Sequence, residues 1–266
     1  MTDDLAKTHY DGTFFDAMEA GALSSAAAVL PIVLELIAPR SIVDVGCGRG
    51  AWLRVAAELG VPQVAGIDGE YVDRRNLLIP AEQFRAEDLR SPFQTGNCYD
   101  LALCLEVAEH LPKNAAGPLV AALVSRGTGG ALFGGDPGQP GTRHINPRFP
   151  EYWSKGFAEH GYVALDAVRP AISWDRRVEP WHRQNMILYV ARSYYEGSPR
   201  LRWYPPIEDP EELLPWEYGG IWRGRVRWRG PLSVLRILIA RALGRELAAG
   251  RSAIFQSLTG ATLCRR

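Results

Sequence analysis

The sequence has no excess of charge, because its 266 residues hold 30 Lys and Arg against 30 Asp and Glu. A neutral chain has no long-range field that would steer it to nucleic acid or to an anionic membrane. No uninterrupted apolar run reaches the ~18 residues of a membrane span. The chain also does not open on a basic segment followed by an apolar stretch, as a secretory signal does. We therefore expect a cytoplasmic protein without a membrane span, and nucleic acid is disfavoured as a partner.

Cysteine is scarce, and the four cysteines lack the C-x-x-C spacing of zinc sites. Cys47 lies inside a glycine-rich segment, where a nucleophilic role is conceivable. A small residue packed beneath the glycine loop explains it equally well, and we favour that interpretation.

From Ser41 onward, short apolar segments alternate with helical ones, which is typical of a parallel sheet with helices on both faces. We expect the last two strands to form an antiparallel edge, because no long helix separates them. The fold class is therefore α/β, with a seven-stranded, mostly parallel sheet. The expected strands are Ser41–Val45, Val64–Asp68, Gln83–Ala86, Leu101–Leu105, Ala131–Gly134, Tyr162–Asp166 and Asn185–Ala191.

The sequence divides into three parts. We predict a helical lid for residues 1–40, the main domain for residues 41–195, and a C-terminal helical extension for residues 196–266. Between residues 223 and 266 the extension holds ten Arg against a single Glu246, and residues 232–243 have the spacing of an amphipathic helix. We expect this helix to dock on the core or on a second subunit, as in a homodimer. Binding of nucleic acid or anionic lipid is the alternative.

A glycine-rich loop, Gly46-x-Gly48-x-Gly50, joins the first strand to a helix, which is a turn that lets a ligand approach the backbone. Dinucleotide-binding proteins share this pattern. Asp44, two residues before the loop, would oppose a pyrophosphate but favour a cofactor that carries an ammonium and a sulfonium.

Carboxylates also follow the next two strands. Asp68 ends the second strand about twenty residues after the loop, where it could accept hydrogen bonds from ribose hydroxyls. Glu87, Asp88 and Leu89 follow the third strand, where a carboxylate could accept from an adenine amino group. The alternative is that Asp68 and Asp88 only terminate strands. Taken together at this spacing, the carboxylates favour the cofactor interpretation.

Four segments resemble the successive motifs of class I S-adenosylmethionine-dependent methyltransferases: Val43–Gly50, Gly66–Gly69, Ala86–Leu89 and Tyr99–Leu111. The resemblance covers about residues 41–191. It implies a Rossmann-like sheet with the last strand inserted antiparallel, S-adenosylmethionine as cofactor and S-adenosylhomocysteine as product. It further implies that Gly46, Gly48 and Gly50 pass under the methionine part of the cofactor, with Glu106 nearby.

The run from Pro137 to Trp153 resembles a bacterial subgroup that is often found among tailoring enzymes for glycans and secondary metabolites. This sequence has Arg143 where the subgroup usually has Gly. The chain has Glu106-Val-Ala-Glu109 where nucleic-acid methyltransferases more usually carry an Asn/Asp-Pro-Pro-Tyr-like element, which argues for a small acceptor.

An alcohol acceptor must lose its proton, and histidine is the side chain best matched to that task. His144, in the Gly- and Pro-rich loop after the fifth strand, is the preferred base. His110, after the fourth strand, is the second candidate, and a hydrogen bond that fixes the loop is the alternative role for His144. His160 is expected to cap a helix, and His182 to lie at the surface.

Aromatic residues are candidates for acceptor binding. Tyr10 and Phe14 would act from the lid, and Tyr152 and Trp174 would form an aromatic wall, with core packing as the alternative. A metal set of His110, His144 and Asp136 can be imagined, but the spacing does not demand it, so no metal is predicted.

The predicted function is methyl transfer from S-adenosylmethionine to a hydroxyl, or an amine, of a secondary metabolite or sugar, in natural-product biosynthesis. O-methylation is favoured over N-methylation. The alternative is a methyltransferase-fold protein that binds the cofactor without transferring methyl, such as a pericyclase-like enzyme or a scaffold.

Overall fold

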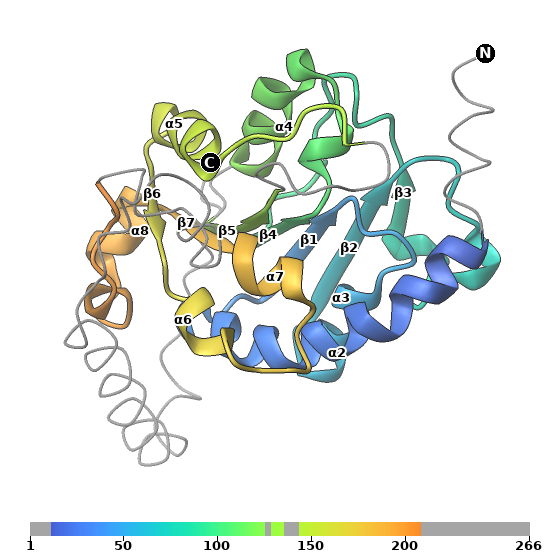
Figure 1. Ribbon diagram of the computed structural model, residues 1–266, viewed down its shortest axis with the longest axis horizontal. Coiled ribbons are helices and arrows are strands. Elements are labelled where there is room, and N and C mark those ends of the chain that lie inside the picture. Colours follow the sequence, from blue (N-terminus) through green and yellow to red (C-terminus); the bar gives the residue numbers. More distant parts are fainter. Residues whose placement is uncertain (1–11, 126–128, 136–143, 209–266) are drawn as a thin grey trace.

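A seven-stranded sheet forms the centre of the computed structural model, which describes residues 12–125, 129–135 and 144–208, with backbone only for residues 12–17. Its strand order is β3-β2-β1-β4-β5-β7-β6 (Figure 1). The strands are β1 (Ser41–Val45), β2 (Gln63–Asp68), β3 (Phe84–Ala86), β4 (Leu101–Leu105), β5 (Gly130–Gly134), β6 (Tyr162–Leu165) and β7 (Ile187–Ala191). Each lies within two residues of its predicted bounds.

The five strands from β3 to β5 are parallel, whereas β7 pairs antiparallel with both β5 and β6. The last strand is thus inserted antiparallel next to the edge strand, and the predicted fold class is confirmed. Because β7 runs backwards, its first residues lie at the same edge of the sheet as the carboxyl ends of the parallel strands. We call this edge the carboxyl edge.

Helices cover both faces of the sheet (Figure 1). The long α2 (Gly12–Ile37) and α3 (Ala51–Glu58) pack on one face, and α4 (Ala116–Leu123) and α5 (Pro150–Glu159) pack on the other. The remaining α-helices are α6 (Arg169–Ile172), α7 (Pro180–Asn185) and α8 (Arg192–Gly197). Single turns of 3-10 helix are η1 (Arg74–Asn76), η2 (Ala81–Gln83), η3 (Ala108–His110), η4 (Lys113–Ala115) and η6 (Leu201–Trp203).

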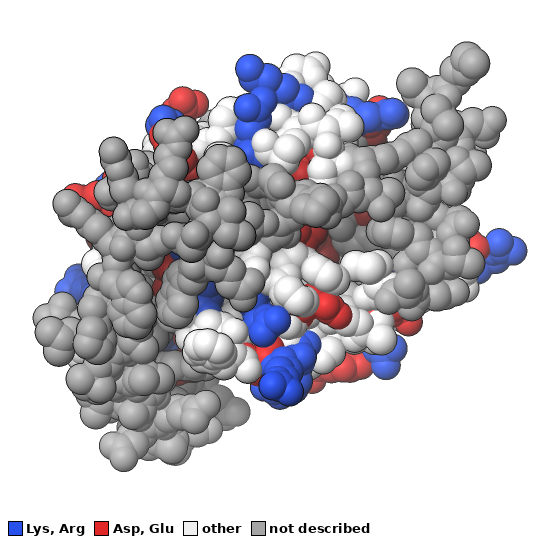
Figure 2. Space-filling model, viewed as in Figure 1, with Lys and Arg blue, Asp and Glu red and all other residues white. Residues whose placement is uncertain are grey.

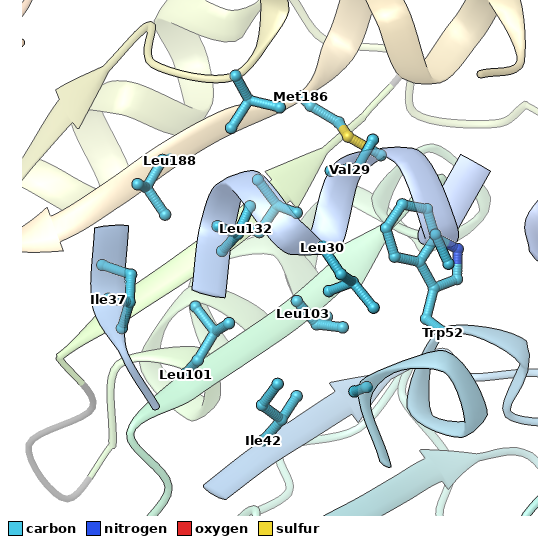
Figure 3. Close-up of a cluster of buried hydrophobic side chains, with 14 of the residues drawn as sticks. Val29, Leu30, Ile37, Ile42, Trp52, Leu101, Leu103, Leu132, Met186 and Leu188 are labelled. Carbon is cyan, nitrogen blue, oxygen red and sulfur yellow. The ribbon is translucent and has the colours of Figure 1, made fainter. Parts of the chain in front are cut away.

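The buried strands divide their side chains between two hydrophobic clusters, because successive residues of a strand point to opposite faces. Leu101 and Leu103 of β4 face α2 and α3, and Cys104 faces α4 and α5. Figure 3 shows the first cluster, in which Val29 and Leu30 of α2 lie over the sheet. On the opposite face Phe157 stacks on Tyr189, with ring centroids 3.9 Å apart. Burial on both faces explains why these strands read as continuous apolar runs.

The segment Met18–Ile37 of α2 is long and apolar enough to cross a membrane, judged by length and composition alone, with a mean hydropathy of 1.9. Polar residues interrupt it, so no single apolar run revealed this property in the sequence. Val29, Leu30 and Val33 are fully buried against the sheet. The apolar composition of the second half of α2 therefore has an explanation in the core of this domain.

Residues 209–266, which include the Arg-rich segment, and the first eleven residues lie outside the described part of the chain. The lid, the homodimer, the domain bounds and the cytoplasmic location stay predictions. On the face in view in Figure 2, acidic and basic side chains of the described residues are interspersed among uncharged ones. This distribution agrees with the balanced composition.

A buried ion pair fixes the chain after β6. The guanidinium of Arg169 donates to both carboxylate oxygens of Asp166 at 2.9 Å, and the side chains are 3% and 6% exposed. Arg169 also donates to the backbone carbonyl of Gln184, at the end of α7. The pair therefore joins α6 to the segment that leads into β7.

We predict that Arg169→Ala lowers the free energy of unfolding by about 3–5 kcal/mol, because it leaves the carboxylate of Asp166 buried without its counter-charge. Arg177→Ala is the matched control, since Arg177 forms a similar pair with Asp175 at the surface. Chemical denaturation followed by circular dichroism measures both. Equal effects of the two substitutions would contradict the structural role of the buried pair.

Candidate functional site

The glycine loop follows β1 at the carboxyl edge and leads into α3. Gly46, Gly48 and Gly50 have φ values of 83°, 53° and 88°, which favour glycine. Three hydrogen bonds hold the loop to the end of β2. The amides of Gly46 and Cys47 donate to the Ile67 carbonyl at 2.7 and 3.3 Å, and the Gly48 amide donates to the Asp68 carboxylate at 2.7 Å. The loop is thus held against its neighbour strand.

Gly46 also lacks room for a side chain. A Cβ there would lie 2.2 Å from Cγ2 of Val107, which follows β4. The backbones of the loops after β1 and β4 therefore approach closely.

Cys47 packs beneath this loop against Gly66 of β2, where a Cβ would lie 2.6 Å from the sulfur. It is buried, and burial together with Asp68 and Asp44 raises the pKa of its thiol well above the ordinary value. A thiol that stays protonated is a poor nucleophile. The structure therefore supports the packing role.

Asp44 lies on β1 directly below the glycine loop and is 3% exposed. Burial, with a smaller contribution from the charge of Asp68, raises the pKa of its carboxyl from 3.8 to about 7. A cationic group placed nearby would favour the ionised form. This behaviour suits a ligand that brings an ammonium.

Asp68 ends β2, as predicted, but much of its hydrogen-bonding capacity is used inside the protein. Its carboxylate accepts from the amides of Gly48 and Gly69, each at 2.7 Å, and from the hydroxyl of Tyr71. A carboxylate offers about four acceptor positions. A ribose that used both its hydroxyls here would therefore have to displace the Tyr71 hydroxyl.

The carboxylates after β3 lie at the surface. Arg90 donates to both oxygens of Asp88, and Arg85 pairs with Glu87 at 3.2 Å. The Glu87 amide donates to the carbonyl of Asp68 at 2.8 Å, so the backbone of this segment lies beside the end of β2. Leu89 is buried. Asp88 thus forms a local turn with Arg90, which agrees with the alternative that it only terminates the strand. Binding of adenine by this segment stays a prediction.

Glu106 follows β4 with a φ of 57°, a conformation that costs energy for any residue but glycine. Its backbone amide donates to the Gly134 carbonyl at 2.9 Å. Its carboxylate accepts from the side-chain amide of Asn185 at 3.1 and 3.2 Å. Such strain is held where the surroundings fix it, and here Gly134 of β5 and Asn185 at the end of α7 supply the partners.

The two candidate catalytic histidines lie together. The rings of His110 and His144 meet edge to face with centroids 4.9 Å apart. The amides of Ile145 and Asn146 both donate to the Glu109 carbonyl, at 2.9 and 3.0 Å. These bonds bring the loop after β5 to the segment after β4, and so they place the two histidines at one point of the carboxyl edge.

Glu109 is the third member of this group and was missed in the sequence. One ligand atom each of Glu109, His110 and His144 lies within 4.8 Å of the others. The carboxylate partner considered in the sequence was Asp136, which lies outside the described residues. The neighbouring position of Glu109 and His110 was the available signal.

Two other residues were also missed. Tyr71 is a surface-type residue in the loop after β2, and nothing in the sequence links it to Asp68. Asn185 reaches Glu106 only because β7 is antiparallel, and the two residues are 79 positions apart.

The other candidate residues are spread out. Tyr152 on α5 is 36% exposed and lies under the guanidinium of Arg148, 5.2 Å away. Trp174, between α6 and α7, is 89% exposed. Tyr10 and the side chain of Phe14 lie outside the described residues. Acceptor binding by these four stays a prediction.

Of the predictions for His160 and His182, the first is confirmed and the second is not. His160 is the C-terminal cap of α5, as predicted. The surface position predicted for His182 is wrong. Its ring is 6% exposed and meets Trp52 edge to face at 5.3 Å, and burial lowers its pKa to about 3. A helix-packing role for Trp52, also buried, agrees with this contact.

The carboxyl edge is strongly electronegative. Burial raises the pKa of the Cys104 thiol at the end of β4, and the charges of Asp44, Glu109, Asp68 and Glu106 raise it further. A glycine cradle without room for a Cβ and surrounding carboxylates together fit a cofactor that has a nucleoside, an ammonium and a sulfonium. The residues present therefore fit S-adenosylmethionine.

Comparison with known proteins agrees with this assignment. A family model described as a methyltransferase domain matches residues 21–185, more than half of the chain. No curated protein sequence matches the chain.

Several solved structures are similar to this chain. The sugar N-methyltransferase KedS8 from Streptoalloteichus sp ATCC 53650 has a TM-score of 0.51 and 18% identity, over 68% of this chain and 92% of that chain. Streptomyces venezuelae DesVI has a TM-score of 0.49 and 14% identity, over 67% and 95%. The methyltransferase domain of bacterial CtHen1-C has a TM-score of 0.47 and 18% identity, over 64% of this chain and 98% of that chain. At these identities the likeness concerns the fold alone.

The fold and the cradle define a class I methyltransferase architecture. The chain belongs to the methyltransferase domain family. Membership implies S-adenosylmethionine as the methyl donor.

We predict that Asp44→Asn stabilises the protein at pH 8 when no cofactor is bound. Folding raises the pKa of this carboxyl from 3.8 to about 7. Its contribution to the free energy of unfolding is therefore fully present below pH 4 and is lost as the pH rises through 7. At ~1.36 kcal/mol per pKa unit, the variant should gain about 4 kcal/mol at pH 8, and the gain should shrink toward pH 4.

Denaturant titrations at both pH values measure this gain, with Glu82→Gln at an exposed position as control. Calorimetry should show that Asp44→Asn binds S-adenosylmethionine more weakly, by tenfold or more. Stabilisation without loss of affinity would place the cofactor's ammonium elsewhere.

Proposed function

We propose that the protein transfers the methyl group of S-adenosylmethionine to a hydroxyl of a small molecule, a sugar or a secondary metabolite. The observation that supports this proposal best is the His110–His144 pair, with ring centroids 4.9 Å apart. The pair lies at the carboxyl edge, and His110 belongs to the same segment after β4 as Glu106. An amine acceptor, which also loses a proton, is second.

The cofactor would be held by the glycine loop and the carboxylates around it. The backbone of Gly46, Gly48 and Gly50 would lie under its methionine part, Asp44 and Glu106 would face its positive charge, and Asp68 would accept from its ribose. Glu87, Asp88 and Leu89 would border the adenine. The cofactor supplies an activated methyl group, so the protein has mainly to align the acceptor and keep water out.

The reaction is an in-line displacement. The acceptor oxygen would form a bond to the methyl carbon as the carbon–sulfur bond broke, and the electron pair would stay on sulfur and give S-adenosylhomocysteine. The hydroxyl proton must leave during attack. An imidazole at the carboxyl edge can accept it near neutral pH.

Exposed apolar side chains follow His144 along the chain, and they suit a small, partly apolar acceptor. Ile145 is 63% exposed, Phe149 is 42% exposed, and Tyr152 lies one helical turn further along the chain. Aromatic and apolar side chains commonly line small-molecule sites. A sugar face or an aromatic ring would find matching surface here.

The first test is whether methyl is transferred at all. Full-length protein, S-adenosylmethionine and pools of sugars, phenols and amines should yield S-adenosylhomocysteine and a product heavier by one methylene, as seen by mass spectrometry. Calorimetric binding of the cofactor with no product from any pool would favour the scaffold or pericyclase-like alternative. Product only from amine pools would replace O-methylation by N-methylation.

The second test of the proposed function concerns His144. We expect His144→Ala to lower kcat by about 100-fold or more, the usual contribution of proton transfer, with little change in the Kd for S-adenosylmethionine. His160→Ala is the matched control, because His160 is exposed at the end of α5. Unchanged turnover in His144→Ala would remove it from the mechanism and leave His110 as the base.

A further inference from the structure

The group formed by Glu109, His110 and His144 has the composition of a metal site. Each residue offers one ligand atom, and the three atoms lie within 4.8 Å of one another. Two imidazoles and one carboxylate form the facial set that binds divalent first-row metals and leaves coordination positions open. The set is assembled from two segments that β4 and β5 bring together.

The surroundings hold this group in place without a metal. Glu109 is 1% exposed, and its backbone carbonyl accepts hydrogen bonds from the amides of Ile145 and Asn146. Because Ile145 follows His144 and Glu109 precedes His110, these bonds hold the two histidine segments together. The backbone therefore sets the spacing of the three side chains in advance.

The local charge also favours a cation. Glu109 is one of four carboxylates whose charges raise the pKa of Cys104. S-adenosylmethionine brings an ammonium, a sulfonium and a carboxylate, so its net charge of one offsets only part of this negative charge. A divalent cation beside the cofactor would offset more of it.

We propose that Glu109, His110 and His144 bind a divalent metal ion that holds the acceptor hydroxyl at an open coordination position. This role rests on the proposed function and replaces proton removal by a free imidazole. A bound divalent ion lowers the pKa of a coordinated oxygen. The hydroxyl proton would then pass to water, the oxygen would form its bond to the methyl carbon, and sulfur would keep the electron pair of the broken bond.

The binding test uses Mn²⁺ alone as the probe. Full-length protein stripped with EDTA and dialysed should bind one Mn²⁺ per chain, as measured by calorimetry and by loss of the free Mn²⁺ signal in electron paramagnetic resonance. Glu109→Gln and His144→Ala should each weaken binding at least tenfold. Glu159→Gln and His160→Ala, exposed at the end of α5, are the matched controls and should bind as wild type.

Binding of S-adenosylhomocysteine, measured in parallel, shows that each variant is folded. Mn²⁺ affinity that is the same in wild type and in both site variants, or no Mn²⁺ binding by wild type, would overturn the metal site. Retained affinity for S-adenosylhomocysteine together with lost Mn²⁺ binding would support it.

Activity separates this inference from the proposed function. EDTA should abolish formation of S-adenosylhomocysteine, and Mn²⁺ should restore it. Full activity after EDTA, with loss in His144→Ala, would overturn the metal role and leave proton removal by imidazole. Absence of transfer with and without Mn²⁺ would count against the proposed function, while the Mn²⁺ titration would still decide the metal site.

Discussion

The attachment of the glycine loop to strand β2 is the constraint on which the site depends. The amides of Gly46 and Gly48 donate to Ile67 and Asp68, at 2.7 Å each, and thereby hold the loop against the end of the neighbouring strand. The close approach of Gly46 to Val107 then fixes the loop relative to the segment after β4. A change in either contact would shift the glycine loop relative to the ends of β2 and β4.

Buried carboxyl groups lie at the carboxyl edge, whereas most of the core is apolar. Asp44 and Asp68 are almost fully buried, and the pKa of each carboxyl is raised mainly by burial. In the free protein this burial costs stability, and a cationic cofactor would recover it. The edge is therefore arranged for a ligand more than for the stability of the empty fold.

The antiparallel strand has a functional consequence beyond closing the sheet. Because β7 starts at the carboxyl edge, the end of α7 just before it also lies there, and Asn185 at that end donates to the carboxylate of Glu106. The buried pair of Arg169 and Asp166, which also contacts Gln184, steadies the segment that places Asn185. Residues distant in the sequence thus fix the side chain of Glu106 through the return of the chain into the sheet.

Local sequence determined the strands, the helices of the sheet faces and the glycine loop. Apolar periodicity and turn-forming glycines act over a few residues, so Ser41–Val45 and the loop after it could be read from the sequence. The sequence also indicated the cofactor, through Asp44 and Asp68. Only the tertiary structure decided the partners: Tyr71 on Asp68, Asn185 on Glu106, and Glu109 with His110 and His144. Tyr71 lies only three residues after Asp68, but the turn that brings its hydroxyl back to the carboxylate is not encoded by the residue types. The other two groups meet because parallel strands end at one edge and the loop after β5 bonds to the Glu109 carbonyl, which are contacts between distant segments.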